Sequence, residues 1–573
     1  MKNYDCPDKD VVFESRRKPA EPAPGQDVSS TCQARRDPRL GTVSATGRVW
    51  KSIDRRWLVF GAALLALVVG LVLHRRFFHD DAYISLRYGE RLLAGKGLTW
   101  NDGERIEGFS NPLWLAQIVL LGFLGVPLAL AARVLGVLYA FATVVLWARS
   151  RSTPAGLLVL VTIPGWTLWA LGGLETISAC FWILMSLVLV WGMRDAPPSR
   201  ARGFALGLSL AAVALGRPEG IAVSLTLLCA AAFVRRGRDL GLAAAPLVVL
   251  FGGYQIFRLA YFGDWIANAA RAKAIDLPVG ARLADAATYV IESAQQWMAA
   301  ALVATWLIVC SPDRRRIWVL LLPCLPLLVL VVAGGGDHML GARFMLAPVA
   351  VLALAGSLAA PSPRGGVRAA TLMLVVVSAL WQLQLSWRYP AERNPAAALG
   401  EFVGRVLKDR LAPGTLIAAA TAGSLPYFAP SLSFIDTLGI NDRHIARTVP
   451  APMPRALSKP DGWFAVPGHR RGDGPYVLSR RPDLIMLGGA HGDIDPWFLG
   501  DFQLLMSERF RADYAPWRWL VPVPPSYQPW VVDQIDSQTG RLPITFYVRR
   551  DSGVWPVVAR QGEPLRPPWI ADR

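Results

Sequence analysis

The chain has 573 residues, of which 53% are apolar and only 18% are charged, and its mean hydropathy is +0.34. This composition excludes an ordinary soluble globular protein and indicates an integral membrane protein. The formal net charge of +18 comes from short Lys and Arg clusters between apolar segments, where basic residues orient membrane spans. We therefore expect no nucleic-acid partner.

The first 56 residues predict a disordered cytoplasmic tail. They mix Pro, Ser, Arg, Lys and Asp without a sustained apolar period, and no apolar core lies close enough to the initial Met for a signal peptide. The first apolar segment, 57–73, is then an uncleaved anchor. Basic residues before it place the N-terminus in the cytoplasm: Arg48, Lys51, Arg55 and Arg56.

Apolar segments recur through residues 57–387 and predict a multispan membrane domain with eleven spans. These are 57–76, 131–148, 155–171, 175–193, 203–216, 219–234, 241–258, 296–311, 317–333, 343–360 and 368–387. A further apolar stretch, 113–126, has the length of an interfacial helix in the first external loop. With this stretch left out of the spans, nearly all basic clusters fall on one side. The C-terminal region is therefore predicted to be extracytoplasmic.

An acid pair, Asp80 and Asp81, opens the first external loop. Carboxylates at a membrane surface are costly to desolvate and usually mark chemistry or transport. In a pocket of low dielectric constant, one carboxylate can act as a general base, or both can orient a hydroxyl. A divalent cation held by the pair with His79 or His338 is the alternative. It is the less favoured one, because no second acidic cluster has ligand spacing.

Other predicted external loops add charged residues. Glu175 begins a helix, where its carboxylate either stabilises the helix dipole or helps to bind an acceptor. Arg217 and Glu219 share a tight turn between two spans, where they form a local ion pair or part of a pocket. Arg258 and Lys273 lie in the next long loop. Their guanidinium and ammonium groups suit a lipid phosphate, although Lys273 could equally reach towards lipid headgroups.

A glycine run followed by Asp337, His338 and Arg343 precedes another span and predicts a pocket wall. Trp100 and two further aromatic residues of the first loop, Phe109 and Trp114, would cover this pocket at the lipid interface. An amphiphilic donor could then enter sideways from the bilayer, while a polar acceptor approaches from outside.

From residue 388 the sequence changes to that of a soluble domain. Buried strands are predicted at 416–420 and 484–487, and an amphipathic helix at 396–408, which together indicate an α/β fold. No cysteine follows Cys324, so this domain has no disulfide. Polar and aromatic residues near its membrane-facing rim either bind the acceptor or belong to a lid that only shapes the cleft: Asp436, Asp442, His444, Trp463 and Tyr476.

Seven motifs in this order resemble a known group of enzymes. They are DDAYISLRYGERLLAGKGLTWNDGERIEGFSNPLW, GLET, RPEG, RLAYFGDWIANAARAK, GGGDHMLGARF, DTLGINDRHIAR and GHRRGDGPYVLSRRPD. The pattern resembles the GT-C superfamily of polyprenyl-phosphate-sugar-dependent glycosyltransferases. It is most similar to the mycobacterial terminal β-(1→2)-arabinofuranosyltransferase family. The resemblance spans residues 57–485.

The resemblance implies a multispan bundle with an extracytoplasmic active site, a soluble C-terminal domain and a decaprenyl-phosphoryl-arabinofuranose type of donor. It carries Asp80 and Asp81 over as the catalytic acids. It also carries over six pocket residues, and we add His338 to them: Arg217, Glu219, Arg258, Lys273, Asp337 and Arg343. The run from Trp265 to Ala269 and Gly216 depart from the family pattern, which leaves the sugar and the acceptor open.

We therefore predict a glycosyltransferase of the bacterial plasma membrane. It would transfer a sugar, with arabinofuranose as the first candidate, from a polyprenyl phosphate to an envelope polysaccharide or glycolipid. Positioning and electrostatic stabilisation would supply most of the acceleration. A protein O-mannosyltransferase, a lipid A aminoarabinose transferase and a transporter of lipid-linked sugars are the alternatives. No motif implies a cofactor, and a divalent cation is left open.

Overall fold

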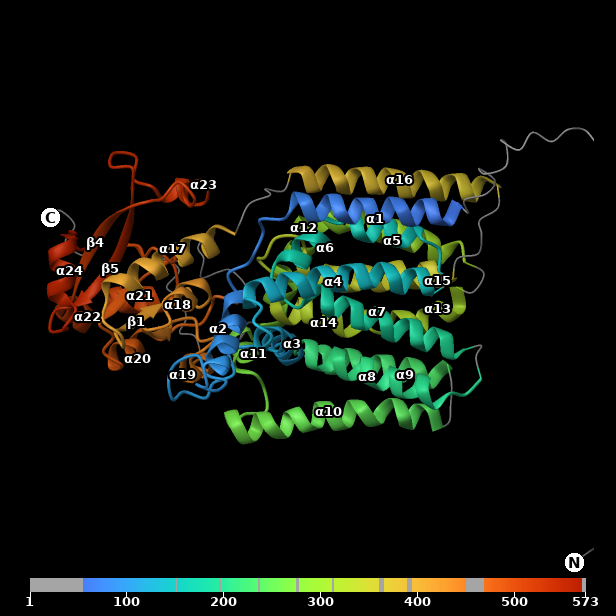
Figure 1. The fold of residues 1–573 in the computed structure, drawn as a ribbon, viewed down its shortest axis with the longest axis horizontal. Helices are drawn as coiled ribbons and strands as arrows, with labels where there is room; N and C mark the ends of the chain where they lie inside the picture. Colours follow the sequence, from blue (N-terminus) through green and yellow to red (C-terminus); the bar gives the residue numbers. More distant parts are fainter. Residues whose placement is uncertain are drawn as a thin grey trace, which may run out of the picture. The chain divides into compact units, whose positions relative to one another are not determined.

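A bundle of long helices and a domain built around a β-sheet make up the part of the chain that the computed structural model describes (Figure 1). The described residues are 55–150, 152–194, 197–234, 238–274, 278–311, 314–359, 365–388, 394–449 and 468–568. The predicted N-terminal tail lies outside them up to residue 54, as does Trp463. All described residues belong to one compact unit, Asp54–Arg573.

Each of the eleven predicted spans lies in one helix or in two consecutive helices. The bundle helices are α1 (Arg55–Leu73), α4 (Leu128–Arg149), α5 (Ala155–Thr162), α6 (Pro164–Leu171), α7 (Thr176–Met193), α8 (Arg200–Gly216), α9 (Gly220–Val234), α10 (Arg238–Phe262), α12 (Val279–Val309), α13 (Arg314–Leu321), α14 (Cys324–Gly334), α15 (Arg343–Ala359) and α16 (Gly365–Arg388). Within the part of the chain that the structure describes, six segments are long and apolar enough to cross a bilayer: 56–73, 128–149, 176–193, 239–262, 317–334 and 365–388. A mainly helical membrane protein is therefore confirmed, while the number of crossings stays a prediction.

Proline explains why one predicted span is divided into two helices. Ile163, which separates α5 from α6, precedes Pro164 and has φ −59° and ψ 125°. A residue before proline is pushed out of the helical region, and the proline itself has no N–H to donate. Pro164 then occupies the first turn of α6, where its missing N–H costs nothing.

The loops at one end of the bundle contain three shorter helices: α2 (Ala82–Leu93), α3 (Pro112–Phe123) and α11 (Asn268–Lys273). Helix α3 confirms the helix predicted near 113–126. The long loop predicted between the spans 241–258 and 296–311 needs correction, because residues 279–292 form the first turns of α12. Ala286, Tyr289 and Ser293 are buried at helical spacing. Charged residues at 282, 285 and 292 interrupt the apolar residues of this segment, so it lacks the continuous apolar run of a membrane span.

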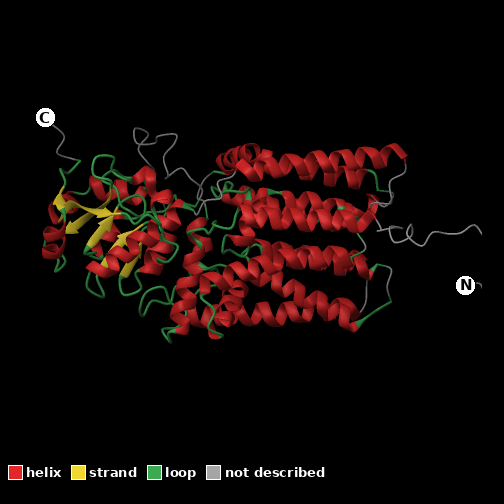
Figure 2. Ribbon diagram, turned by 45° about the horizontal axis from the view of Figure 1, so that its top comes forward, coloured by secondary structure: helices red, strands yellow, loops and turns green. Residues whose placement is uncertain are grey.

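The sheet domain contains six strands in the order β2-β1-β3-β5-β4-β6 (Figure 2). The strands are β1 (Leu416–Ala419), β2 (Ser433–Asp436), β3 (Leu484–Met486), β4 (Tyr514–Pro522), β5 (Arg541–Arg549) and β6 (Glu563–Pro564). Strands β2, β1 and β3 are parallel, and the others join antiparallel. Both strands predicted from the sequence are present.

Helices flank this sheet: α17 (Pro395–Arg410), α18 (Ser424–Phe428), α19 (Arg443–Arg447), α20 (Gly474–Ser479), α21 (Leu499–Met506), α22 (Glu508–Asp513), α23 (Gln528–Val531), the 3-10 helix η3 (Val532–Gln534) and α24 (Trp555–Gln561). Helix α17 confirms the predicted amphipathic helix. Because parallel strands point the same way, the loops after β1 and β2 leave the sheet at one edge. These loops contact the end of the bundle: after β2, the Gly439 carbonyl accepts from the Asn268 side chain at 2.9 Å, and after β1, the Ser424 backbone N–H donates to Asp80 at 2.9 Å.

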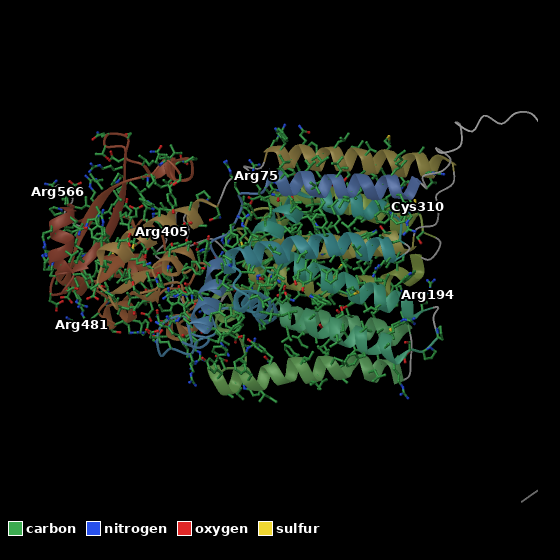
Figure 3. All side chains as sticks on the ribbon, in the orientation of Figure 1. Arg75, Arg194, Cys310, Arg405, Arg481 and Arg566 are labelled. Atoms are coloured by element: carbon green, nitrogen blue, oxygen red, sulfur yellow. The ribbon has the colours of Figure 1, made fainter. Side chains whose placement is uncertain are left out.

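The two ends of the bundle differ. Arg75, which follows α1, lies at the end next to the sheet domain, where Figure 3 also places Arg405 and Arg481. Arg194 and Cys310, which follow α7 and α12, lie at the remote end. The loops with the acidic and polar motifs lie beside the sheet domain, where Asp80 accepts from Ser424 and Asn268 donates to Gly439, and the side of the membrane that they face stays a prediction.

Candidate active site

A cavity of about 390 Å³ lies where the loops of the bundle meet the sheet domain. Its walls come from α2, the loops before α3, α7 and α9, helix α11, and the segment between α14 and α15. It brings together eight residues that the sequence predicted for the site: Asp81, Glu175, Arg217, Glu219, Lys273, Asp337, His338 and Arg343. Segments more than 250 residues apart in the chain thus form one polar pocket.

Asp81 and Lys273 form an ion pair in this cavity. The Lys273 Nζ donates to Asp81 Oδ2 at 3.0 Å, and the two side chains are 41% and 24% exposed. Burial by itself raises the pKa of Asp81, but the positive charge and the hydrogen bond of Lys273, added to the smaller effects of neighbouring groups, together hold the pKa below its ordinary value. Asp81 is therefore an ionised, accessible carboxylate at neutral pH.

His79 fixes the backbone next to this carboxylate. Burial lowers the pKa of His79 to about 4, so its ring is neutral at pH 7. Its Nδ1 accepts the backbone N–H of Asp81 at 3.2 Å, and the ring centroid lies 5.5 Å from that of Trp169. A neutral, packed histidine of this kind orients Asp81 rather than adding a charge.

Asp337 and Arg343 form the second ion pair, with Nε donating to Oδ2 at 2.9 Å. Gly335 and Gly336 turn the chain into this segment with φ of 66° and 92°, which favour glycine. Burial alone raises the pKa of Asp337, but the charge of Arg343 holds it below its ordinary value. Burial also lowers the pKa of His338, so that ring is neutral and closes the wall without a charge.

Arg343 has hydrogen-bond donors that its ion pair with Asp337 does not use. Its guanidinium carbon lies 5.2 Å from the Trp169 ring centroid and 5.0 Å from that of Phe344. Only its Nε bonds to Asp337, and no described residue accepts from its two terminal nitrogens. Two parallel N–H donors of this kind suit a phosphate or a carboxylate.

Glu175 is part of a buried network. Its Oε1 accepts from Arg217 Nη1 at 2.7 Å and its Oε2 from Asn111 Nδ2 at 2.7 Å. Asn111 Oδ1 accepts in turn from the Ser85 hydroxyl at 3.1 Å. Arg217 also pairs with Glu219. Glu175 occupies the N-cap position of α7 without a capping hydrogen bond, so its carboxylate lies both at the helix start, where the helix dipole favours it, and in the pocket wall.

Asp80 points away from the cavity, which differs from its predicted role. Its Oδ1 accepts the backbone N–H of Ser424 at 2.9 Å and also the Ser424 hydroxyl, and it is not among the cavity-lining residues. Burial raises the pKa of Asp80 to about 6. The carboxylate therefore joins the bundle to the start of α18, while its neighbour Asp81 faces the reaction space.

Arg258 lies beside the cavity rather than in it. Its Nε donates to Glu107 at 2.7 Å, and Tyr254 donates to the other oxygen of the same carboxylate at 2.5 Å. A smaller cavity of about 160 Å³ is lined by Arg258 and shares Arg217 with the larger one. This position is compatible with a donor that reaches the site past α10, although Arg258 is already neutralised by Glu107.

Two residues predicted for the site, Trp100 as a cover of the pocket and Asp436 as an acceptor contact, are buried elsewhere. Trp100 is 2% exposed and packs against the Arg87 guanidinium at 5.2 Å and against Phe434. Asp436 is 1% exposed and accepts the backbone N–H groups of the turn at residues 438–441. Burial raises its pKa to about 6. Both predictions need correction, because these side chains hold the fold and do not line the cavity.

Three further predicted acceptor contacts, Asp442, His444 and Tyr476, line a separate surface groove. Residues that the sequence reasoning missed also matter for the cavity: Ser85, Asn111, Arg282, Ser424 and His469. Asn111 and His469 belong to quoted motifs, whereas nothing in the sequence around Ser424 marks it as the partner of Asp80. The described residues contain no group of three or more His, Cys, Asp or Glu side chains that could hold a metal ion.

Two named proteins are similar to parts of this chain in sequence. One relative, a terminal β-(1→2)-arabinofuranosyltransferase of Mycobacterium tuberculosis, is 32% identical over 229 residues, which cover 35% of this chain and 35% of the relative. The predicted resemblance is confirmed. A protein of the same name from Corynebacterium glutamicum is 28% identical over 275 residues, or 41% of this chain and 38% of the relative. The chain thus matches little more than a third of the length of these relatives.

Two further comparisons describe parts of the chain. Residues 388–537 match a family described as a domain of unknown function, DUF8728. Among solved structures, ArnT from Cupriavidus metallidurans bound to undecaprenyl phosphate covers 66% of this chain and 85% of its own, with a TM-score of 0.47 and 13% identity. The arabinofuranosyltransferase AftD from Mycobacteria covers 67% of this chain and 32% of its own, with a TM-score of 0.41 and 18% identity.

Proposed function

We propose that this protein is a membrane glycosyltransferase of the bacterial plasma membrane that transfers arabinofuranose from a polyprenyl phosphate to an envelope glycan. The observation that carries the proposal is the cavity in which the ionised Asp81 lies beside Lys273 and a guanidinium with free donors, that of Arg343. The sequence similarity to named arabinofuranosyltransferases supports this choice of sugar.

The donor phosphate would bind to Arg343 and Lys273. These two cations line the same cavity, and each has donors beyond the one that its acidic partner uses. Charge-assisted hydrogen bonds to phosphate are the strongest that these side chains make. As the bond between the anomeric carbon and the phosphate oxygen breaks, the same contacts would stabilise the negative charge on the departing polyprenyl phosphate.

Asp81 would act on the sugar side of the same step. Because Lys273 holds its pKa low, the carboxylate is a weak base that stays ionised. Its main contribution would then be to orient the acceptor hydroxyl and to stabilise positive charge at the anomeric carbon. The hydroxyl oxygen forms the new bond to that carbon as the bond to the phosphate oxygen breaks, and the hydroxyl proton passes to the departing phosphate or to solvent.

We further propose that the cavity faces the extracytoplasmic side, with the domain of residues 388–573 outside and the N-terminus inside. The charged and polar motif residues gather at the sheet-domain end of the bundle, and Arg194 lies at the other end (Figure 3). Arg481→Cys, at an exposed position of the sheet domain, should react with a membrane-impermeant maleimide in intact cells. The unsubstituted chain provides the background, and labelling only after lysis would reverse the topology.

The test of activity uses the purified full chain in detergent. We expect transfer from decaprenyl-phosphoryl-arabinofuranose to a synthetic arabinofuranoside, with polyprenyl-phosphoryl-mannose and undecaprenyl-phosphoryl-aminoarabinose as parallel donors. Preference for either of these would support the corresponding alternative transferase. Absence of turnover with all three donors, combined with movement of the intact lipid-linked sugar across proteoliposomes, would support a transporter and contradict the proposal.

A further inference from the structure

A second hollow, about 890 Å³ in volume, lies outside the candidate active site. We call it the rim groove, and its lining is Gly103, Glu104, Arg105, Ile106, Ala260, Tyr261, Phe262, Gly263, Asp442, Arg443, His444, Arg447, Thr448, Tyr476 and Arg480. It shares none of these residues with the active-site cavity. The first external loop, the end of α10 and helices α19 and α20 thus meet in a hollow that the proposed reaction does not use.

Flat ring surfaces occupy two places in the rim groove. The ring of His444, whose side chain is 51% exposed, stacks on Tyr476 with centroids 4.0 Å apart and planes at 16°. The guanidinium carbon of Arg105 lies 4.7 Å from the Tyr261 ring centroid. Large, rigid aromatic surfaces with a polar edge provide contact area at a low cost in conformational entropy. They suit the C–H face of a sugar ring.

Hydrogen-bonding groups of both kinds surround these rings. The Tyr476 hydroxyl donates to Asp442 at 3.1 Å and accepts from Arg480 at 2.7 Å. Arg480 also reaches Glu104 at 3.3 Å. Donors and carboxylate acceptors therefore alternate along one side of the rim groove, a pattern that matches neighbouring hydroxyls, each of which both donates and accepts.

The arginines of the rim groove do not form an open anion site. Arg447 pairs with Asp264 at 2.5 Å, and Arg480 is engaged by Glu104 as described above. Arg443 donates to the backbone carbonyls of Arg105, at 3.1 Å, and Phe262. Since most of these cations already have acceptors, the groove favours a neutral polyhydroxyl ligand over a phosphate.

The rim groove and the active-site cavity lie back to back across two loops. Ile106 lines the groove and Gly108 the cavity, and likewise Asp442 lines the groove and Ile440 the cavity. Residues two positions apart have Cα atoms at most about 7 Å from each other. An extended glycan of a few sugar rings could therefore reach from one hollow to the other around this wall.

The wall itself is fixed by hydrogen bonds. The Tyr88 hydroxyl donates to the Ile106 carbonyl at 2.6 Å and accepts the Gly108 N–H at 2.9 Å. The Asn268 amide, on α11, donates to the carbonyls of Gly439 and Ile440 at 2.9 Å each. Both hollows are thus held in place before any ligand binds, which lowers the entropic cost of binding.

We propose that the rim groove binds a neutral oligosaccharide, namely the part of the acceptor glycan remote from the sugar that is extended. This inference rests on the proposed function, because the proposed function supplies the choice of an oligosaccharide made of pentofuranose sugars. The His444 ring and the Arg105 guanidinium, which lie on Tyr476 and Tyr261 and are supported by them, carry sugar rings. Glu104 and Asp442 accept from the sugar hydroxyls, and Arg480 donates to them. The groove thereby increases the residence of long acceptors at the active site.

The test measures binding of a fluorescently labelled arabinofuranose hexasaccharide to the purified full chain by fluorescence anisotropy. We expect saturable binding that Tyr476→Ala weakens about tenfold, the equivalent of one lost aromatic platform. Tyr476→Phe should weaken it less, and Arg105→Ala, at an exposed position, should weaken it measurably without a risk to folding. Arg509→Ala is the matched control, since this exposed arginine pairs with Asp513 in α22 outside the groove.

Several outcomes would overturn the proposal. These are an absence of saturable binding, equal affinity in Tyr476→Ala and Arg105→Ala, and displacement of the hexasaccharide by millimolar inorganic phosphate, which would indicate an anion site. A thermal unfolding temperature equal to that of the unsubstituted chain shows that a variant is folded. The measurement needs neither donor nor turnover, so its failure is distinguishable from failure of the proposed transfer reaction.

Discussion

Replacing Asp81 with Asn tests the assignment of the active site most directly. The substitution keeps the shape of the side chain and an oxygen that can accept from Lys273, which lies 3.0 Å away, but it removes the negative charge. If Asp81 stabilises positive charge at the anomeric carbon, the variant should bind its substrates with little change in KM and turn them over slowly.

The structure sets the size of this effect. Two unit charges about 4 Å apart interact by about 4 kcal/mol at an effective dielectric constant of about 20. The Asp81 side chain is 24% exposed, so solvent screens part of that interaction and about 2–4 kcal/mol remains. The expected loss in kcat is then about 30- to 1,000-fold.

The assay follows transfer of labelled arabinofuranose from decaprenyl-phosphoryl-arabinofuranose by the purified variant in detergent. Asp80→Asn is the matched comparison, because this neighbour bonds to Ser424 and lies outside the cavity lining. We expect it to change the unfolding temperature more than the chemistry. Full activity of Asp81→Asn together with loss of transfer in Asp80→Asn would refute the assignment of the two acids.

Three further predictions concern pH and packing. In Lys273→Met, the Asp81 carboxylate stays buried but loses the positive charge beside it, so the pKa of Asp81 should rise above its ordinary value. The transfer rate of this variant should then fall at an acidic pH at which the rate of the unsubstituted enzyme does not fall. Asp436 has a folded pKa of about 6 against 3.8, so its contribution to stability is complete below pH 4 and is lost as the pH rises through 6. Asp436→Asn should therefore remove about 3 kcal/mol of the change in the free energy of unfolding between pH 4 and 6. The unfolding temperature of the variant should depend less on pH over this range. Gly423→Ala would press a methyl group onto the backbone and carboxylate of Asp80 and should destabilise the protein by about 1–3 kcal/mol, whereas Gly553→Ala, which meets open space, should leave the unfolding temperature within a degree or two.

Most of the helical architecture could be predicted from the sequence, because a span needs a long apolar run that composition reveals directly. The same reasoning failed for residues 279–292. They form the first turns of α12, in which Arg282, Asp285 and Glu292 interrupt the apolar residues. Such charges lower the mean hydropathy of a segment below that of a membrane span, even where its buried positions keep helical spacing.

The motifs around Asp81, Glu175 and Asp337 likewise identified most of the cavity from the sequence, because each places charged groups beside a span, where only a function or a partner offsets their desolvation. Which groups face the cavity was a matter of tertiary structure alone. Asp80 and Asp81 are adjacent and chemically identical, yet successive side chains leave the backbone in different directions. Their partners, Ser424 and Lys273, lie 344 and 192 residues away. Only the packing of the sheet domain and α11 against the bundle brings those partners into contact, and this decides which acid is buried and which stays available for chemistry.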